Sequence, residues 1–199
     1  MSARVFPEFL YEPVEQVAPL LLGCELERTL GDGTKVRVRI VETEAYDQDD
    51  EASHTYRGER KRNATMFRAA GHLYVYFTYG MHHCCNVVTG VESYGSGVLV
   101  RAVEPVMGRE YIENRRGMSG VAATNGPGKV CQALAIDLAL SGHDLRSEPL
   151  RLIAKPLHEG ESIVSSPRIG ISKAREVHRR YYIDGNPYVS RAKPSSTVA

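Results

Sequence analysis

The sequence contains no run of about 18 apolar residues, the length that a membrane-spanning helix needs. Its first ten residues, MSARVFPEFL, also lack the long apolar segment of a secretory signal. These two absences argue against a membrane-spanning helix and against export. We therefore expect a soluble intracellular protein with no membrane partner.

Cysteine is scarce, with four residues at positions 24, 84, 85 and 131, and no two of them have the CxxC spacing. A chain of 199 residues needs no disulfide framework to fold, so we expect free thiols. The run His82–Cys85 holds two histidines and two cysteines, but consecutive strand residues point to opposite faces and no second ligand pair follows at a standard spacing. We expect no bound metal ion.

Two further ligand-binding motifs are incomplete. The segment GPGKV resembles a phosphate-binding loop, yet Ala123 stands where that motif has glycine and Val130 where it has serine or threonine. The acidic run DQDDEAS resembles a calcium-binding loop, yet Ala52 stands where that loop has glycine and Gly58 where it has glutamate. We expect neither ligand.

The composition, 42% hydrophobic and 25% charged, allows a substantial core. We expect one domain over residues 1–193 and a disordered tail over 194–199. The net charge of +1 hides an asymmetry, because residues 1–60 carry 7 basic and 13 acidic side chains whereas residues 61–199 carry 18 and 11. Two interpretations remain open: a basic face that suits a polyanion, or an ordinary mixed surface.

Periodicity and turn residues predict an α+β protein with a largely antiparallel sheet. Two hairpins are expected, one over 25–45 and one over 71–88. Further strands are predicted at 97–102, 150–154, 168–171 and 181–183, and helices at 14–22, 108–114, 126–138 and 172–180.

The strand VRVRIVETEAY places two carboxylates on the face that carries apolar residues. Side chains two apart share a strand face, so Glu42 and Glu44 follow Val36, Val38 and Ile40. Burial raises the pKa of a carboxyl group and makes it a better base near neutrality, whereas a nearby arginine holds it ionised. The alternative is that both glutamates face solvent at a strand end.

The hairpin GHLYVYFTYGMHHCCNVV carries unusually many rings and polar groups for two adjacent strands. Tyr74, Tyr76 and Thr78 share one face, and His82, Cys84 and Asn86 share a face of the return strand. This face either packs in the core or presents its groups to a cavity. The turn would expose Tyr79 and Met81, which is unfavourable unless an apolar partner receives them.

Seven ordered motifs resemble those of the alkyladenine (3-methyladenine) DNA glycosylase family, and the resemblance extends from about Pro13 to Ser190. The segments are IVETEAY at Ile40–Tyr46, EAxH at Glu51–His54, RN and MF within Arg62–Phe67, GHLYVYFTYGMHxCxN at Gly71–Asn86, VLVRAxEP at Val98–Pro105, GPGKxCQALAI at Gly126–Ile136 and GNPYVS at Gly185–Ser190.

The resemblance implies a monofunctional enzyme of base-excision repair that acts, as a monomer without metal or cofactor, on double-stranded DNA containing alkylated, deaminated or etheno purines. It implies a curved sheet with surrounding helices and a protruding hairpin that intercalates into DNA. Such an enzyme rotates the damaged base into a pocket, where stacking on aromatic rings offsets the cost of unstacking.

By resemblance, Tyr76 stacks on one face of the flipped base, with Tyr46 and His54 on the other. Cys84, Asn86 and Leu99 form the pocket wall, where the Asn86 amide would crowd the 2-amino group of guanine. Tyr79 fills the space that the base leaves in the helix, and Met81 supports it from the minor groove.

The resemblance makes Glu44 the general base that activates a water against C1′, while Arg101 and the backbone carbonyl of Ile169 hold that water. Lys129, at a helix start, resembles a phosphate contact, and a Schiff-base lysine is the rival reading. Arg62 and Met66 are expected to contact the DNA backbone or groove.

The sequence departs from the family pattern at His83, at Cys85 and in the segment RAAG at Arg68–Gly71, and Arg60-Lys61 stands where Thr-Pro is common. These departures concern pocket volume and DNA contacts.

Three alternatives stay open: a glycosylase that prefers deaminated purines, a lesion-binding protein that flips bases without cleaving them, and a generic basic nucleic-acid-binding domain. The brevity of the chain suggests a bacterial source, which implies a nucleoid-associated cytoplasmic protein; a eukaryotic one would be nuclear.

Overall fold

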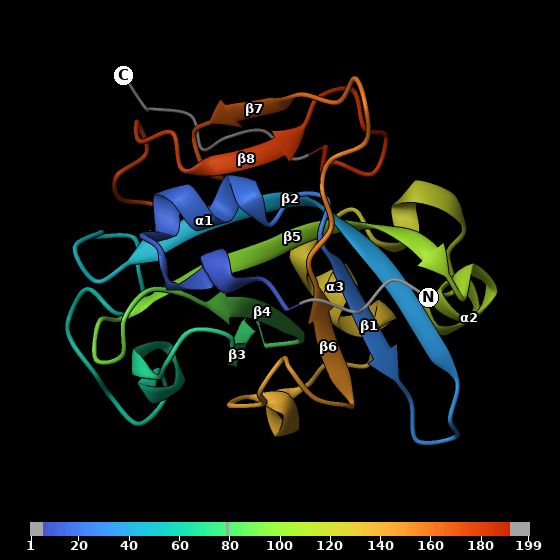
Figure 1. Ribbon diagram of the computed structural model, residues 1–199, viewed down its shortest axis with the longest axis horizontal. Helices are drawn as coiled ribbons and strands as arrows, with labels where there is room; N and C mark the ends of the chain where they lie inside the picture. Colours follow the sequence, from blue (N-terminus) through green and yellow to red (C-terminus); the bar gives the residue numbers. More distant parts are fainter. Residues whose placement is uncertain (1–5, 79, 192–199) are drawn as a thin grey trace.

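A curled, eight-stranded antiparallel sheet forms the centre of the molecule (Figure 1). The computed structural model describes residues 6–78 and 80–191, and all strand pairs within them are antiparallel. The strands are β1 (Glu25–Thr29), β2 (Lys35–Asp47), β3 (Leu73–Thr78), β4 (His82–Val88), β5 (Ser96–Met107), β6 (Leu150–Ile153), β7 (Ile163–Ser166) and β8 (Arg180–Ile183).

The sheet has the strand order β3-β4-β5-β2-β1-β6, and β8 pairs with both β2 and β7. Strand β2 pairs with β1 through its first residues, Lys35–Arg39, and with β8 through Glu42–Glu44. Register shifts around Ile40–Thr43 mark irregularities between β2 and β5, and such bulges bend a strand. Because β5 and β8 flank β2 at Glu42–Glu44, this part of the strand lies deep inside the protein. The expected α+β class with a curved, largely antiparallel sheet is confirmed.

Three α-helices occur in the described residues: α1 (Val14–Leu20), α2 (Arg109–Arg116) and α3 (Pro127–Ala133). Four short 3-10 helices complete the list, at Glu8–Tyr11, Ala64–Phe67, Gly120–Ala123 and Leu138–Leu140. Helix α1 contacts β2, and α3 contacts β4 and β5. None of the described helices has the length and apolarity needed to cross a membrane.

The main core lies between the sheet and these helices. Val36, Val38 and Ile40 are fully buried, as their alternation in β2 predicts. Gly23, which connects α1 to β1, has a φ of +91° and closely approaches a neighbouring segment: a Cβ there would lie 2.8 Å from the carbonyl oxygen of Pro156. Only glycine fits this close approach in this backbone conformation.

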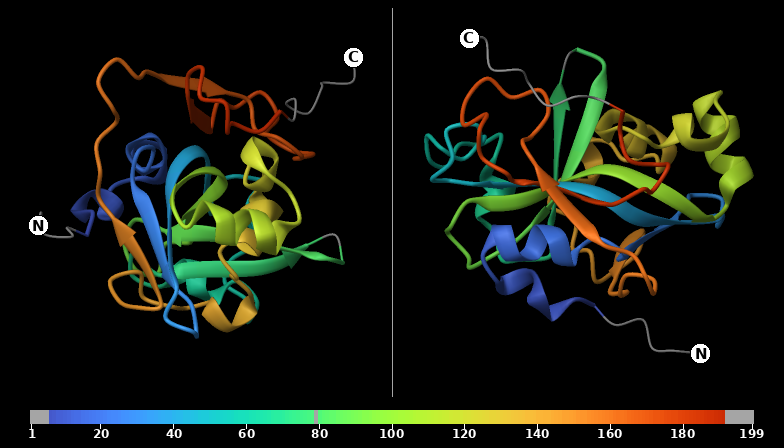
Figure 2. Two further views of the ribbon diagram at one scale, coloured as in Figure 1. Left: turned by 90° about the vertical axis from the view of Figure 1, so that its right-hand side faces the viewer. Right: turned by 90° about the horizontal axis from the view of Figure 1, so that it is seen from above.

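Strands β3 and β4 form the second predicted hairpin and extend beyond the body of the molecule on the side away from α1 (Figure 2, right). Tyr74 pairs with Asn86 and Tyr76 with Cys84, so the expected shared face exists. Residue Tyr79 lies outside the described residues, as does the expected tail 194–199.

One predicted helix is shorter than expected, and two predicted elements are wrong. The helix over 126–138 ends at Ala133, because Ala135 has a φ of +51°, and Leu138 lies in a separate 3-10 helix with 53% of its surface exposed. The segments 168–171 and 172–180 form neither the predicted strand nor the predicted helix. Gly170 has a φ of +73°, which interrupts an extended strand, and residues 172–180 carry too few apolar side chains to bury a helix face.

Candidate active site

A cavity of about 450 Å³ opens between the β3–β4 hairpin, the centre of β2 and β5, and two irregular segments at 51–54 and 169–173. Its wall combines ionisable, aromatic and small apolar side chains. The lining residues are Glu44, Tyr46, Glu51, Ala52, His54, Met66, Tyr74, Tyr76, Thr78, Cys84, Asn86, Leu99, Arg101, Pro127 and Ile169 to Lys173. The structure thus brings together all nine residues predicted for catalysis and base binding.

Glu44 is completely buried and accepts three hydrogen bonds. Its Oε2 accepts from the Tyr46 hydroxyl at 2.8 Å and from Arg101 Nη1 at 3.1 Å, and its Oε1 accepts from the Ile169 amide at 2.8 Å. The group of Ile169 that contacts Glu44 is therefore the amide N–H, whereas the resemblance assigned a role to its carbonyl. All three partners are donors, which suits the acceptor-only carboxylate.

Arg101 lies between two buried carboxylates. Its Nε donates to Glu42 at 2.9 Å, while its Nη1 donates to Glu44. Burial alone would lower the pKa of Arg101, but Glu44 and Glu42 outweigh it and raise that pKa, so the guanidinium stays charged.

Glu42 accepts further hydrogen bonds besides the one from Arg101. Arg180 Nε donates to Glu42 at 2.7 Å, and the Ser190 hydroxyl and amide donate at 2.8 and 2.7 Å. Glu42 is completely buried, as Glu44 is, so the alternative that both face solvent is wrong. Glu42 does not line the cavity, and its place behind Arg101 makes it a support for that side chain.

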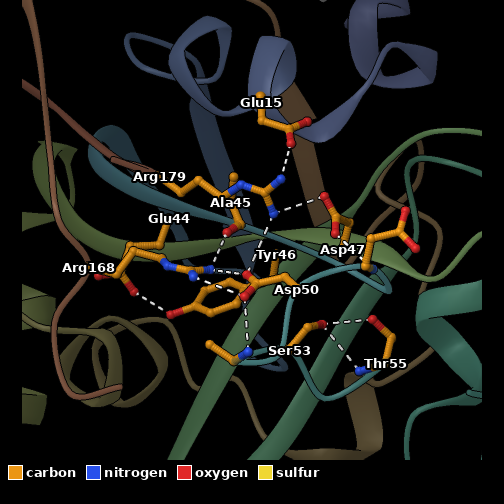
Figure 3. A network of polar contacts seen from close by, with 12 residues as sticks. Glu15, Glu44, Ala45, Tyr46, Asp47, Asp50, Ser53, Thr55, Arg168 and Arg179 are labelled. Atoms are coloured by element: carbon orange, nitrogen blue, oxygen red, sulfur yellow. Dashed lines mark hydrogen bonds and ion pairs between the residues drawn. The ribbon is translucent and has the colours of Figure 1, made fainter. Parts of the chain in front are cut away.

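Tyr46 connects Glu44 to a second buried ion pair (Figure 3). The Arg168 guanidinium lies over the Tyr46 ring, with Cζ 4.6 Å from the ring centroid, and Arg168 also pairs with Asp50. Burial, followed by the charge of Glu44, raises the pKa of the Tyr46 hydroxyl well above its ordinary value. Tyr46 therefore remains protonated and donates to Glu44.

Three rings line the opposite part of the cavity. His54 contacts Tyr76 edge to face, with 4.5 Å between ring centroids, and Tyr74 stacks on Tyr76 at 5.7 Å. The Nδ1 of His54 lies 3.1 Å from the Tyr74 hydroxyl. Partial burial of His54, and then the charge of Arg62, lower the pKa of its imidazole. Because His54 and Tyr76 already touch, a base could lie between them only if one ring moved.

Asn86, Cys84 and Leu99 all line the cavity, as predicted for the pocket wall. Asn86 is 4% exposed, and its Nδ2 has no hydrogen-bond partner within the described part of the chain. A buried amide donor without a partner is uncommon, and here it borders open space. Burial raises the pKa of the Cys84 thiol to about 11, so this thiol is neutral at physiological pH.

The residues that depart from the family pattern lie outside the cavity wall. The His83 ring contacts Phe77, with 5.2 Å between centroids, on the outer face of the hairpin. Cys85 is buried, and its nearby side chain together with burial raises the pKa of the Cys131 thiol in α3 well above its ordinary value. Arg68 donates to the carbonyl of Gly142 at 3.0 Å.

The predicted DNA-contacting residues are dispersed around the cavity. Met81 is 67% exposed at the end of the hairpin, and Arg62 is exposed. Lys129, the third residue of α3, donates to Asn125 Oδ1 at 2.7 Å and does not line the cavity. Met66 is 2% exposed and packs with Phe67, Tyr74 and Val88, so it belongs to the cavity wall and is too buried for the expected DNA contact.

Two features of the site were missed by sequence reasoning. Arg168 and its partner Asp50 are separated by 118 residues, so no local pattern links them. Residues 170–173 also line the cavity, although only their neighbour Ile169 was predicted as a site residue and these four were expected to end a strand and begin a helix. Residues 6–78 and 80–191 contain no group of three or more histidine, cysteine, aspartate or glutamate side chains that could hold a metal ion.

Comparison with known proteins gives one consistent result. The family model for methylpurine-DNA glycosylase (MPG) matches residues 8–187. A protein of Carboxydothermus hydrogenoformans is 48% identical over 187 residues, covering 92% of this chain and 97% of the relative. A protein of Methanoculleus marisnigri is 47% identical over 179 residues (88% and 92%), and one of Chlorobium phaeovibrioides is 42% identical over 194 residues (96% and 99%). All three carry the name "Putative 3-methyladenine DNA glycosylase".

Proposed function

The chain belongs to the methylpurine-DNA glycosylase family, and from this premise we propose that it flips a damaged purine out of duplex DNA and hydrolyses its N-glycosidic bond with a water activated by Glu44. Family membership supports the coarser statement that the protein is a DNA glycosylase for alkylated purines in base-excision repair. The finer proposal depends on one observation: a buried carboxylate and a set of stacked rings share one cavity.

The cavity suits a base that has left the duplex. A base inside the helix is stacked and paired, so an enzyme must extrude it, at a cost of a few kcal/mol. Tyr76, Tyr46 and His54 offer ring faces or edges, and stacking on such rings is worth about 1–3 kcal/mol per base. The Tyr46 ring has Arg168 on one face, which leaves its other face for the base.

The hydrogen bonds of Glu44 leave room for a water. A carboxylate has about four lone-pair positions, and Tyr46, Arg101 and Ile169 occupy three of them. The remaining position can accept a hydrogen bond from a water in the cavity. In the proposed step the water oxygen bonds to C1′, its proton goes to Glu44, and the C1′–N bond breaks with its electron pair going to the purine.

The charge of the lesion determines how much help the step needs. A cationic base such as 7-methylguanine leaves as a neutral molecule, whereas hypoxanthine leaves as an anion unless it gains a proton. Neutral lesions therefore depend more strongly on general-base catalysis, which typically contributes about 10²–10⁴-fold.

A hydrolytic, monofunctional reaction is favoured over a Schiff base by the position of Lys129. Its ammonium group is engaged with Asn125 and lies outside the cavity lining. We propose that Lys129 and Arg62 contact phosphates. Lys173 is the lysine that does line the cavity, so trapping with borohydride tests both residues. A covalent protein–DNA adduct after borohydride treatment would contradict the hydrolytic proposal.

We propose that the hairpin enters the DNA, with Met81 in the minor groove and Tyr79, which lies outside the described residues, in the vacated position. The enzyme is proposed to act as a monomer, because residues of one chain supply the lining of the cavity. Its place of action is that of its substrate, the nucleoid in a bacterial cell or the nucleus in a eukaryotic one.

The proposed function is tested by incubating the protein with duplexes that carry 3-methyladenine, 7-methylguanine, hypoxanthine or ethenoadenine, followed by chromatography of the liberated bases. Release of free base and formation of an abasic site are expected. Tight, lesion-selective binding with no released base would indicate a base-flipping protein without catalysis. Equal affinity for damaged and undamaged duplexes would indicate a generic nucleic-acid-binding domain.

A further inference from the structure

Arg168 is the largest fully buried side chain among the described residues, and no sequence motif pointed to it. Its two terminal nitrogens contact the two carboxylate oxygens of Asp50, with 3.1 Å between Nη2 and Oδ1. Its Nε is buried and has no partner among the residues that the structure describes. Burying an ion pair costs several kcal/mol of lost hydration per ion, so such a pair is weak evidence for stability and raises the question of its role.

One contact of Arg168 fixes Tyr46. The guanidinium lies over the ring, and Nη1 donates at 2.9 Å to the carbonyl of Ala45, the residue between Glu44 and Tyr46 (Figure 3). The orientation of the ring in turn directs the Tyr46 hydroxyl onto Glu44 Oε2. Arg168 therefore controls one of the three donors to Glu44.

A second contact follows from chain connectivity. The next residue, Ile169, donates its amide to Glu44 Oε1 at 2.8 Å. Residues 167–171 belong to no strand or helix, so regular backbone pairing does not hold this amide in place. The anchoring of the Arg168 side chain on Asp50 and Ala45 does so instead. Arg168 thereby also controls a second donor to Glu44.

The third donor has a separate support, because Arg101 is held by Glu42. Building on the proposed function, we propose that Arg168 is a positioning residue for the general-base step. It holds Tyr46 and Ile169 so that both donate to Glu44 and leave one lone pair of the carboxylate directed at the water. Arg168 does not line the cavity, so it acts only through these neighbours.

A comparison of a neutral with a cationic leaving base distinguishes a positioning role of Arg168 from a role in folding. Single-turnover excision of hypoxanthine and of 7-methylguanine is measured with saturating enzyme for the wild type, Arg168→Met and Arg168→Lys. Misplacing Glu44 should slow the neutral lesion more than the cationic one, whereas a loss of folded enzyme should lower both amplitudes alike. For Arg168→Met we expect the ratio of the two rate constants to shift by about 10–100-fold against hypoxanthine.

Arg168→Lys keeps a buried cation, which makes it the variant that tests the proposal if Arg168→Met does not fold. A lysine cannot pair with both oxygens of Asp50 and also stack on Tyr46 as a guanidinium does. We expect an intermediate shift of the ratio, about fivefold or more.

Arg39 provides the matched control. Like Arg168, it is a buried arginine that is paired with a carboxylate, that of Glu161. Its Nε has no partner among residues 6–78 and 80–191, and it lies outside the cavity. Arg39→Met should change the ratio by less than about twofold. An unchanged ratio in both Arg168 variants, or an equal shift in Arg39→Met, would overturn the positioning role. Failure of the wild type to release either base would instead overturn the proposed function itself.

Discussion

At the scale of single residues, the site consists of buried acidic and basic side chains that alternate in space. Glu42, Arg101 and Glu44 follow one another in space, and the Arg168–Asp50 pair lies beyond Tyr46. Each charged group is satisfied mainly by another charged group or by a fixed donor. Such an arrangement holds a carboxylate in one orientation, which is what a general base requires.

Removal of Arg101 should destabilise the whole protein. In Arg101→Met, Glu44 would lose its contacting cation while remaining completely buried. Glu42 would keep one cation, Arg180, and its two Ser190 donors. We expect the free energy of unfolding, measured by urea titration, to fall by about 3–5 kcal/mol. Adding Glu44→Gln to this variant should restore part of the loss; an unchanged unfolding midpoint in Arg101→Met would contradict the account.

Sequence reasoning at this scale succeeded where residues were close in the chain. The alternation in β2 placed Glu42 and Glu44 on the face of the apolar residues but left their burial open, and the structure shows that both are buried. The alternation could not predict that Arg168 and Asp50 pair beside the site. An ion pair between residues 118 positions apart depends on how the finished fold brings two loops together.

At the scale of elements, the β3–β4 hairpin supplies both a cavity wall and the projecting end of the molecule. Tyr76 and Cys84 are paired across it and face the cavity, whereas Phe77 and His83 are paired next to them and face outward. The two faces follow from the twofold periodicity of strands. The hairpin could be predicted because its alternation and its turn residues agree.

Met81 should contribute to DNA binding and not to folding. Its exposed side chain would bury apolar surface only in the complex. Met81→Ser should weaken binding to a hypoxanthine-containing duplex by about tenfold, close to 1.4 kcal/mol, and change the free energy of unfolding by less than about 0.5 kcal/mol. Affinity is measured by fluorescence anisotropy.

Leu20 is the control for Met81. It is 50% exposed and is the last residue of α1. Helix α1 lies on the side of the molecule away from the hairpin (Figure 2). Leu20→Ser should leave DNA affinity unchanged. An equal loss of affinity in both variants would remove the hairpin from the DNA interface.

The segment from residue 167 to 179 was mispredicted because tertiary contacts, and not local preferences, determine its path. The bidentate pair of Arg168 with Asp50 and the ion pairs of Arg179 with Glu15 and Asp47 fix both of its ends. Its composition favours no single element, so sequence periodicity carried little information here. The same segment forms one wall of the cavity, which is therefore the part of the site that sequence reasoning resolved least.

At the scale of the whole molecule, the curled sheet brings together parts of the chain that lie far apart in sequence. Strand β2 pairs with β5 along its length and with β8 at the glutamates, so early, middle and late segments meet at Glu44. Arg39 connects β2 to the segment before β7 through its ion pair with Glu161. This ion pair adds a side-chain contact to the backbone pairing of β8 with β2 and of β7 with β8.

The Arg39–Glu161 pair should contribute to acid sensitivity. The hydrogen bond from Arg39 lowers the pKa of Glu161 below its ordinary value of 4.5. The carboxylate therefore contributes stability that is fully present above pH 4.5 and is lost as the pH falls through the lower, folded-state pKa. In Glu161→Gln, the free energy of unfolding should fall less steeply below that pH than in the wild type. Parallel pH profiles from denaturant titrations would contradict this contribution.

The central claim is that Glu44 performs general-base catalysis on a base held by the rings of the cavity. Its most direct test is the single-turnover release of hypoxanthine from a duplex by the wild type and by Glu44→Gln, with affinity measured for the same duplex. Glutamine keeps the size of the side chain but cannot accept a proton from water at neutral pH. We predict binding within about threefold of the wild type and excision slower by about 100-fold or more. Undiminished excision by Glu44→Gln would contradict the account.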